Sequence, residues 1–370
     1  MKLRIALTHL YAWPEVRRGG ERYMHELAGA LAEAGHDVLI MSTAVTPGRD
    51  RILGVEIRYC LRRYRFKLEK WFPGQGDEVA FAAAALARLG LRRLDVWHAL
   101  GTADAAAAAF LGRIRRVRSV YTDLGIPERA YRDRRSDWRL HRFVAHRIDR
   151  YVCLSHAAGA QLVRDYGRDP VVLGGGVDLR VFHPAERRHP TPTLLFTSDV
   201  TEVRKNLPLL LEAVGLLRRQ HPALELWLAG PGDPTAALDS APPAARAAAA
   251  SIGVGTLEEL VDLYGRAWVT VLPSFNEAFG LVALESLASG TPVVTLTEGA
   301  PAELVAPETG ATAAPNPTAL AAALARAIEL AGDPGTSAAC RAAAEPHDWR
   351  GGIVPRMEAV YCDAISGLAS

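Results

Sequence analysis

The sequence predicts an α/β protein of two doubly wound domains in tandem, each built on a parallel sheet. Short apolar runs alternate with helical patterns from the first residues onward, the pattern of repeated strand–helix–strand units. A stretch from Gly174 to Pro192, rich in Gly, Pro, His and Arg and without periodicity, separates two such series. The chain has 370 residues, 49% of them hydrophobic, so two domains can each bury a core.

The first series starts in a strand and alternates regularly. After the first loop, Leu27, Leu31 and Ala34 recur at helical spacing and Gly35 ends the helix. Apolar runs predict strands at 3–8, 37–43, 55–59, 95–98, 119–122, 151–154 and 171–173. Helical patterns predict helices at about 77–89, 103–111, 139–148 and 156–166.

The second series follows the same logic. Five apolar residues from Leu207 to Leu217 share one face of a predicted helix. Strands are predicted at 194–197, 224–229, near 252, 268–272 and 291–295, with helices at 257–264 and 317–330. A final helix at about 353–365 follows a break at Pro346 and Gly351-Gly352.

Composition argues against several classes of protein. The formal net charge of +2 gives no whole-molecule field for nucleic acid. Four scattered cysteines indicate neither a disulfide framework nor a zinc site and fit a reducing cytosol. No signal-peptide segment opens the chain and no apolar stretch is long enough to span a bilayer, so we expect a soluble, cytoplasmic protein.

The stretch from Pro273 to Glu285 is the strongest functional element in the chain. An apolar run stops at Pro273, a turn follows, and a helical pattern runs on to Gly290. Helix N-terminal amides at Phe279 to Leu281 suit a phosphate, while Glu277 and Glu285 suit sugar hydroxyls. The alternative is that Glu277 caps the helix and Glu285 is a solvated surface residue.

Two other loops follow strands in the same way. Gly19-Gly20 precedes a helix, where bare backbone can approach an anion, or is simply a flexible joint. Arg204-Lys205 also precedes a helix, and two cations there are unfavourable unless an anion joins them. The chain has only four lysines, so Lys205 suggests a point charge for phosphate rather than an exposed basic turn. Ligands of doubly wound sheets bind beyond the carboxyl ends of the strands, so a cleft between the domains would collect these loops.

The first domain contains further candidates. Basic clusters lie at 58–70, 113–118 and 129–150, and without a broad apolar stripe they favour a solvated face over contact with anionic lipid or an acidic acceptor. His98 and Asp123 follow or end strands and could act as general base or hydrogen-bond partners, with a structural role as the alternative for each.

These pieces together resemble the retaining GT-B glycosyltransferases of glycosyltransferase family 4 over nearly the whole chain. The motifs are Gly19-Gly-Glu-Arg22 with Gly35-His-Asp-Val38, Gly175-Gly-Val-Asp178, Arg204-Lys-Asn206, Gly230-Pro-Gly232, Pro-Ser-x-x-Glu-x-Phe-Gly-Leu with its two glutamates, and Gly290-Thr-Pro-Val-Val294. The resemblance implies two Rossmann-like domains facing a central cleft, with the last helix crossing back to the first domain. It implies an acceptor domain at 1–175, a linker at 176–192, a nucleotide-sugar domain at 193–350 and the returning helix at 351–370.

The resemblance also implies roles for single residues. Lys205 would bind the diphosphate, Glu285 the ribose hydroxyls, and Glu277 would face the donor sugar, while Gly20 would approach the diphosphate from the other domain. The implied donor site comprises Gly19, Gly20, Arg204, Lys205, Gly230, Leu257, Asn276, Glu277, Ala278, Phe279, Gly280, Leu281 and Glu285. The catalytic candidates are Lys205, Glu277, Asp123 and His98. The resemblance implies no cofactor and no metal.

Two departures from the family pattern stand out. Asp199 occupies the place of an arginine that usually helps the lysine hold the diphosphate, and Arg204 is its candidate substitute. Many members have a His shortly after the strand at 119–122, and Asp123 is the candidate replacement here.

The expected function is transfer of a sugar, with retention, from a nucleoside-diphosphate sugar to the hydroxyl of a small-molecule or lipid-linked acceptor. The arginine- and alanine-rich composition is typical of a high-GC bacterium, and natural-product, cell-envelope and small-thiol glycosylation are all compatible with such a source. The alternatives are a sugar-nucleotide epimerase or hydrolase on the same frame, and a sugar-nucleotide-binding protein without catalysis.

Overall fold

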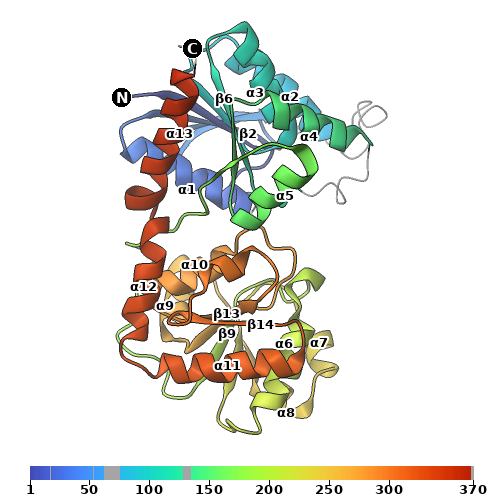
Figure 1. Cartoon of the computed structure of the whole chain (residues 1–370), viewed down its shortest axis with the longest axis vertical. Helices are drawn as coiled ribbons and strands as arrows, with labels where there is room; N and C mark the ends of the chain where they lie inside the picture. The colour runs from blue at the N-terminus through green and yellow to red at the C-terminus, as the bar shows by residue number, and fades with distance from the viewer. Residues whose placement is uncertain (17, 53, 62–75, 128–134, 368–370) are drawn as a thin grey trace. The chain divides into compact units, whose positions relative to one another are not determined.

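The structure is a computed structural model of the chain and describes all residues except 17, 53, 62–75, 128–134 and 368–370. It divides into two compact units (Figure 1). Unit 1 comprises Met1–Gly176 and Trp349–Ser370, and unit 2 comprises Val177–Asp348.

Unit 1 is a sheet flanked by helices, with strand order β3-β4-β2-β1-β5-β6-β7-β8 among the described residues. Its strands are β1 (Arg4–Thr8), β2 (Asp37–Ala44), β3 (Gly48–Ile52), β4 (Val55–Leu61), β5 (Val96–Ala99), β6 (Arg118–Asp123), β7 (Arg150–Cys153) and β8 (Val171–Val172). Its helices are α1 (Gly19–Glu33), α2 (Gly76–Leu89), α3 (Thr102–Ile114), α4 (Arg135–Arg147), α5 (His156–Tyr166) and α13 (Val354–Ser366). Neighbouring strands pair in parallel except β3 with β4.

The apolar runs form the inner strands because helices cover both faces of a parallel sheet. The last four residues of β1 are all buried. Local signals set helix ends: the Ser155 hydroxyl accepts from the Ala158 amide at the start of α5, and Gly167, with φ of 63°, ends that helix.

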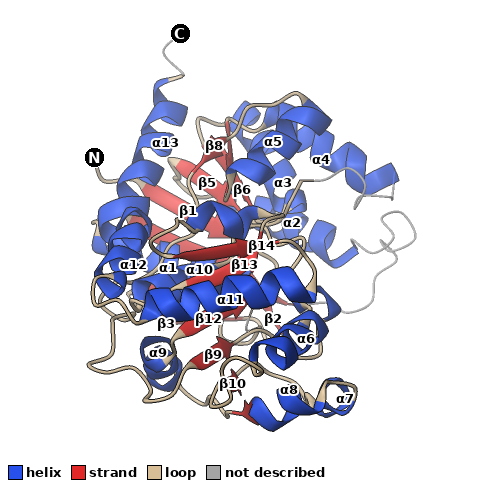
Figure 2. Cartoon of the chain, turned by 60° about the horizontal axis from the view of Figure 1, so that its bottom comes forward, coloured by secondary structure: helices blue, strands red, loops and turns tan. Residues whose placement is uncertain are grey.

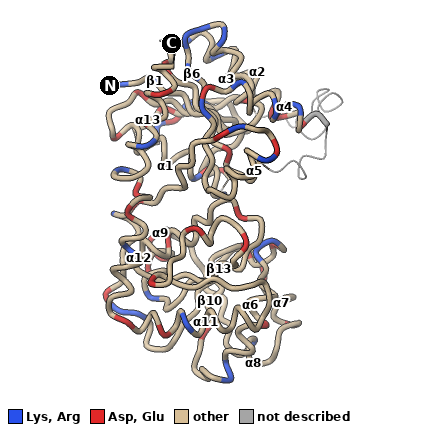
Figure 3. The backbone as a smooth tube through the Cα atoms, in the orientation of Figure 1, with Lys and Arg blue, Asp and Glu red and all other residues tan. Residues whose placement is uncertain are grey.

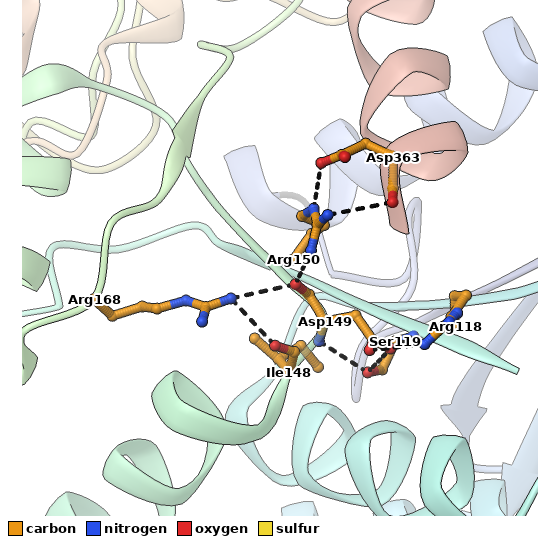
Figure 4. A network of polar contacts seen from close by, with 7 residues as sticks. All are labelled: Arg118, Ser119, Ile148, Asp149, Arg150, Arg168 and Asp363. Carbon is orange, nitrogen blue, oxygen red and sulfur yellow. Dashed lines mark hydrogen bonds and ion pairs between the residues drawn. The ribbon is translucent and has the colours of Figure 1, made fainter. Parts of the chain in front are cut away.

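The last helix, α13, belongs to unit 1. The Arg150 guanidinium binds the Asp363 carboxylate of α13 and also donates to the Asp363 carbonyl, as Figure 4 shows. Beside it, Asp149 joins the starts of β6 and β7 by accepting from the amide and hydroxyl of Ser119. The contacts between Arg150 and Asp363 hold α13 against the sheet of unit 1.

Unit 2 is a second parallel sheet, with order β11-β10-β9-β12-β13-β14 in the described part of the chain (Figure 2). Its strands are β9 (Thr193–Phe196), β10 (Glu225–Leu228), β11 (Ala249–Ser251), β12 (Val269–Leu272), β13 (Val293–Leu296) and β14 (Gly310–Ala313). Its helices are α6 (Leu207–Leu217), α7 (Thr235–Asp239), α8 (Pro243–Ala248), α9 (Leu257–Arg266), α10 (Leu281–Ala288), α11 (Pro317–Ala331) and α12 (Thr336–Ala344). Its core joins buried side chains of α6 and α11 to those of the strands.

Residues 177–192, expected as part of a linker, pack onto unit 2. Phe182 is buried, and the Arg188 guanidinium donates to the carbonyls of Ala267 and Gly290 at 2.7 and 2.9 Å. The two parallel-sheet α/β units confirm the predicted fold class.

Candidate active site

Arg204 and Lys205 meet Glu277 at one edge of the unit 2 sheet. The two cations lie in a 3₁₀ turn, Val203–Lys205, that follows β9, and Glu277 follows β12. Because β9 and β12 are adjacent parallel strands, the loops after them lie side by side. Lys205 Nζ and Arg204 Nη1 both donate to Glu277 Oε2, at 2.7 and 2.9 Å.

Glu277 therefore supplies the anion that two cations before the N-terminus of α6 require. Burial lowers the pKa of the Arg204 guanidinium, but the charge of Glu277 and the hydrogen bond to Glu202 outweigh burial and leave that pKa raised. The cations predicted to hold a diphosphate are thus paired with carboxylates of the protein itself.

Two asparagines shape the loops that hold this cluster. Asn206 and Asn276 have φ of 57° and 54°, and in the described chain they are the non-glycine residues with positive φ. Asparagine tolerates this left-handed conformation better than most residues. The Phe275 amide donates to the Arg204 carbonyl at 3.2 Å, which ties one loop to the other. Unusual backbone at both loops is typical of functional sites.

The N-terminus of α10 opens beside this cluster. Gly280 is its N-cap, with φ of 97°, and a Cβ there would come within 2.9 Å of Pro301 Cγ. In the described part of the chain, the amides of Gly280, Leu281 and Val282 donate no hydrogen bond. Gly280 and Leu281 are among the donors predicted from the sequence, whereas Val282 was not, and Glu277 is not the cap.

Glu285 is buried in the second turn of α10 and is not a solvated surface residue. It accepts from the Tyr264 hydroxyl at 2.8 Å, and Tyr264 in turn contacts the Thr197 hydroxyl at 3.0 Å. Tyr264 was not predicted from the sequence, although its place in the last turn of an amphipathic helix offered a signal. Tyr264 links the carboxylate to the end of β9.

Asp199 and Gly230 lie in the loops after the neighbouring strands β9 and β10. Asp199 accepts from the hydroxyl and amide of Thr201, and these hydrogen bonds hold the pKa of its carboxyl below the usual range. A Cβ on Gly230 would lie 1.7 Å from the Ser198 carbonyl oxygen, so glycine is required for the two loops to pack.

Leu257 lies apart from the cation cluster. It follows the N-cap Thr256 of α9 and lines a hollow of about 720 Å³ together with Val181, residues 183–187 and other residues of α9. None of the other predicted donor-site residues lines this hollow.

Gly19 and Gly20 begin α1 in unit 1. Gly20 lines a cavity of about 370 Å³ with His9, Glu21, Asp104 and other residues. A Cβ on Gly20 would lie 3.0 Å from Leu124 Cδ1, so glycine keeps this wall open.

Asp104 is a buried carboxyl that lines the same cavity and was not predicted from the sequence. It lies in the first turn of α3, and its isolation in an alanine-rich helix was the available signal. The Thr8 hydroxyl donates to Asp104 and accepts from Trp97 Nε1. Burial raises the pKa of the carboxyl to about 8, so it is largely neutral at pH 7.

Asp104→Asn is expected to stabilise the fold at alkaline pH. A carboxyl whose pKa is raised by folding contributes fully below its ordinary pKa and loses that contribution as pH rises through about 8. The stability gap between variant and wild type should widen by about 1.4 kcal/mol per pH unit between ~4 and ~8. Thermal melts of both proteins between pH ~4 and ~8 measure this gap, and Asp239→Asn, at an exposed position, is the control. If the stability of wild type and of Asp104→Asn changes in parallel with pH, the prediction is refuted.

His98 lies in the interior of unit 1, and its geometry gives a general-base role no support. Its ring nitrogens contact the Tyr361 and Thr122 hydroxyls, each at 2.7 Å. Burial lowers its pKa to about 3. The sequence predicted that His98, near the end of a strand, could be open to substrate. In the structure, Tyr361 of α13 contacts its ring.

Asp123 ends β6 and is also buried. It accepts from the Tyr151 hydroxyl at 2.7 Å and the Gly125 amide at 3.0 Å. His141 of α4, not singled out from the sequence, lies 3.7 Å from its carboxylate and contacts Tyr151 at 2.8 Å. Asp123 is thus part of a buried hydrogen-bonded network, and its role as the replacement for the family's histidine stays a prediction.

The described residues contain no group of three His, Cys, Asp or Glu side chains suited to a metal ion. Among the same residues, no helix has the length and apolar character needed to cross a membrane.

Two protein families match the chain. Residues 17–181 match the family described as Glycosyltransferase Family 4, and residues 191–329 match the one described as Glycosyl transferases group 1. The chain is 30% identical over 352 residues to a glycogen synthase of Mycobacterium tuberculosis, covering 86% of this chain and 84% of the relative. It is 35% identical over 175 residues to a D-inositol 3-phosphate glycosyltransferase of Streptomyces bingchenggensis, covering 41% and 38%.

Solved structures share the fold. Sucrose-phosphate synthase from Thermosynechococcus elongatus matches with a TM-score of 0.77 and 22% identity, over 99% of this chain and 100% of that one. Anabaena HepE in complex with UDP and glucose matches with a TM-score of 0.72 and 16% identity, over 99% and 100%. The catalytic domain of Arabidopsis thaliana starch synthase IV, bound to ADP and acarbose, matches with 0.73 and 12%, over 99% and 100%. The chain therefore belongs to glycosyltransferase family 4 and is a glycosyltransferase with the GT-B fold.

Proposed function

We propose that this glycosyltransferase moves a sugar, with retention of its anomeric configuration, from a nucleoside-diphosphate sugar to a hydroxyl acceptor. The observation that carries the proposal is the convergence of Lys205 and Arg204 on one oxygen of Glu277, beside the open amides of α10. Cations and amides at one place suit the two phosphates of a nucleotide sugar.

This arrangement stabilises above all the departing nucleoside diphosphate. As the bond from sugar to diphosphate breaks, negative charge grows on the phosphate oxygens, and Lys205 and Arg204 stabilise that charge more than the ground state. Arg204 would take over the role of the arginine whose place Asp199 occupies, and its sharing of a carboxylate partner with Lys205 supports this assignment. The amides of Gly280 and Leu281 add donors whose orientation is fixed by the helix.

The sugar and nucleoside would be held by the two glutamates. A donor diphosphate competes with Glu277 for its cations, which releases that carboxylate toward the sugar hydroxyls. Glu285, already oriented by Tyr264, would accept from the ribose hydroxyls. Solved relatives of the same fold contain UDP or ADP, which favours those nucleotides as first candidates for the donor.

Retention follows in this proposal from departure of the diphosphate on the face where the acceptor hydroxyl enters. We assign acceptor binding to unit 1, and small-molecule and lipid-linked hydroxyls of natural-product and cell-envelope biosynthesis form the first acceptor panel. We also propose that the reaction needs no metal ion, because lysine, arginine and amides supply the positive charge that a metal would supply.

A panel assay tests the function. Nucleoside diphosphate release is measured with UDP- and ADP-sugars, with and without each acceptor, in the presence of EDTA. Release that depends on an acceptor, with a product whose anomeric NMR coupling matches the donor, is the expected result. Release without acceptor would indicate a hydrolase, a changed sugar on the nucleotide an epimerase, and thermal stabilisation without turnover a binding protein.

A further inference from the structure

We infer that unit 1 carries a surface that binds anionic lipid bilayers at the edge where α2 and α3 end. This edge patch consists of the turn 91–93 after α2 (Leu91, Arg92, Arg93), and Phe110 and residues 113–116 at the end of α3 (Arg113, Ile114, Arg115, Arg116). It extends beyond the proposed function, because none of these residues belongs to the sites described above.

The fold brings these two segments together. Each helix leads into a strand, α2 into β5 and α3 into β6, and those strands are parallel neighbours, so both helices end at the same edge. Leu89 and Leu111 pack in one core cluster, and a Cβ on Gly90 would lie 3.8 Å from Leu111 Cδ1. The turn after α2 therefore lies against the last turn of α3.

Apolar side chains stand in solvent at this edge. Leu91 is 87% exposed, Ile114 65% and Phe110 51%. Phe110 and Ile114 are four residues apart on α3 and share one face of it. Scattered single exposed apolar residues are ordinary, but three from adjoining segments of one edge indicate an interaction surface.

Cations surround these apolar side chains. Among the described residues, Arg93, Arg113, Arg115 and Arg116 make no ion pair with a carboxylate. Two nearby carboxylates are already engaged, Asp95 with Arg4 and Asp149 with Arg118. Figure 3 shows basic residues gathered where α3 ends and β6 begins.

A structural role explains the arginines of the edge patch but not its exposed apolar side chains. Arginines at a helix C-terminus interact favourably with its dipole, so their presence there requires no ligand. The exposed Leu91, Ile114 and Phe110 gain nothing from that dipole and lose free energy in water. Nucleic acid would engage the arginines but not the aliphatic tips.

A bilayer surface accounts for both components. Aliphatic and aromatic tips enter the boundary between headgroups and acyl chains, while arginines meet anionic headgroups. The sequence alone favoured a solvated face because neither helix has a broad apolar stripe. The structure changes that conclusion because the apolar tips come from two separate segments.

Vesicle sedimentation with the full chain tests the inference. Vesicles of phosphatidylcholine with phosphatidylglycerol should sediment the wild type, pure phosphatidylcholine vesicles should not, and high salt should release the protein. Leu91→Ser with Ile114→Ser, and separately Arg115→Gln with Arg116→Gln, should each lower the partition coefficient about tenfold. Val163→Ser, an exposed apolar residue of α5, serves as the matched control and should bind like wild type.

Melting temperatures and nucleoside diphosphate affinity should stay unchanged in all these variants, because the patch is separate from the donor site in unit 2. The inference is overturned if wild type ignores the anionic vesicles, if either double variant binds them as wild type does, or if the protein binds duplex DNA in place of vesicles. None of these outcomes bears on the proposed transferase activity, which the nucleotide release assay tests independently.

Discussion

Lys205→Ala is expected to lower kcat by about 10²-fold or more, because it removes the positive charge that stabilises the departing diphosphate. Its Nζ lies 2.7 Å from Glu277 Oε2, in a cluster that retains Arg204 after the substitution. The fold should therefore survive, and the loss should appear in turnover rather than in thermal stability. Steady-state nucleotide release with the best donor and acceptor measures the effect.

Two variants make this result specific. Lys205→Arg keeps the positive charge and should retain part of the turnover that Lys205→Ala loses. Arg219→Ala removes an exposed arginine just after α6 and should have the turnover of wild type. Wild-type turnover in Lys205→Ala would show that the diphosphate binds elsewhere.

Glu277→Gln should have opposite effects on product binding and on turnover. Glu277 pairs with both Lys205 and Arg204, so its loss leaves the Lys205 ammonium without its carboxylate partner and Arg204 with Glu202 alone, and the site becomes more positive for an incoming anion. Nucleoside diphosphate should bind about tenfold tighter, as expected for loss of one nearby charge in a partly buried site. Turnover should fall, because a carboxylate proposed to face the donor sugar is lost and the product leaves more slowly. Calorimetric titration and steady-state kinetics on the same preparation measure both effects.

Glu202→Gln is the matched control for this charge effect. The Glu202 carboxylate also contacts Arg204, at 2.9 Å, but it is more exposed than that of Glu277, and the Lys205 ammonium pairs with Glu277 instead. It should tighten nucleotide binding less than Glu277→Gln does. Weaker or unchanged nucleotide affinity in Glu277→Gln would contradict the view that this carboxylate competes with the diphosphate.

Most of the fold was predictable because the inner strands of both sheets are short apolar runs between amphipathic helices. The elements that escaped prediction lack that signal. Strand β3 is a polar edge strand, exposed along most of its length, and β14 has the sequence Gly-Ala-Thr-Ala with no large side chain. Helix α12 buries only Thr336, Cys340 and Ala344, so no periodic pattern of large apolar residues marks it.

The candidate site was predictable where topology alone decides proximity. Arg204, Lys205 and Glu277 follow strands, and parallel strands place their following loops at one edge of the sheet. The sequence does not give strand order, however, so the adjacency of β9 and β12 and the shared carboxylate oxygen had to come from the structure.

Burial was the part that the sequence could not supply. His98 is the third residue of a central strand, and only the return of α13, some 260 residues later, places Tyr361 against its ring. Asp104 looked like one acidic residue in a helix, yet α3 carries it into the interior beside Thr8 and Trp97. Such long-range contacts leave no local periodicity to detect.

The central claim is that unit 2 holds a nucleoside diphosphate on Lys205, Arg204 and the α10 amides. Its most direct test is the affinity for UDP and ADP, measured by titration into wild type, Lys205→Ala and Glu277→Gln. The account predicts that at least one nucleotide binds the wild type, more weakly Lys205→Ala and more tightly Glu277→Gln. Equal affinities for all three proteins would contradict it.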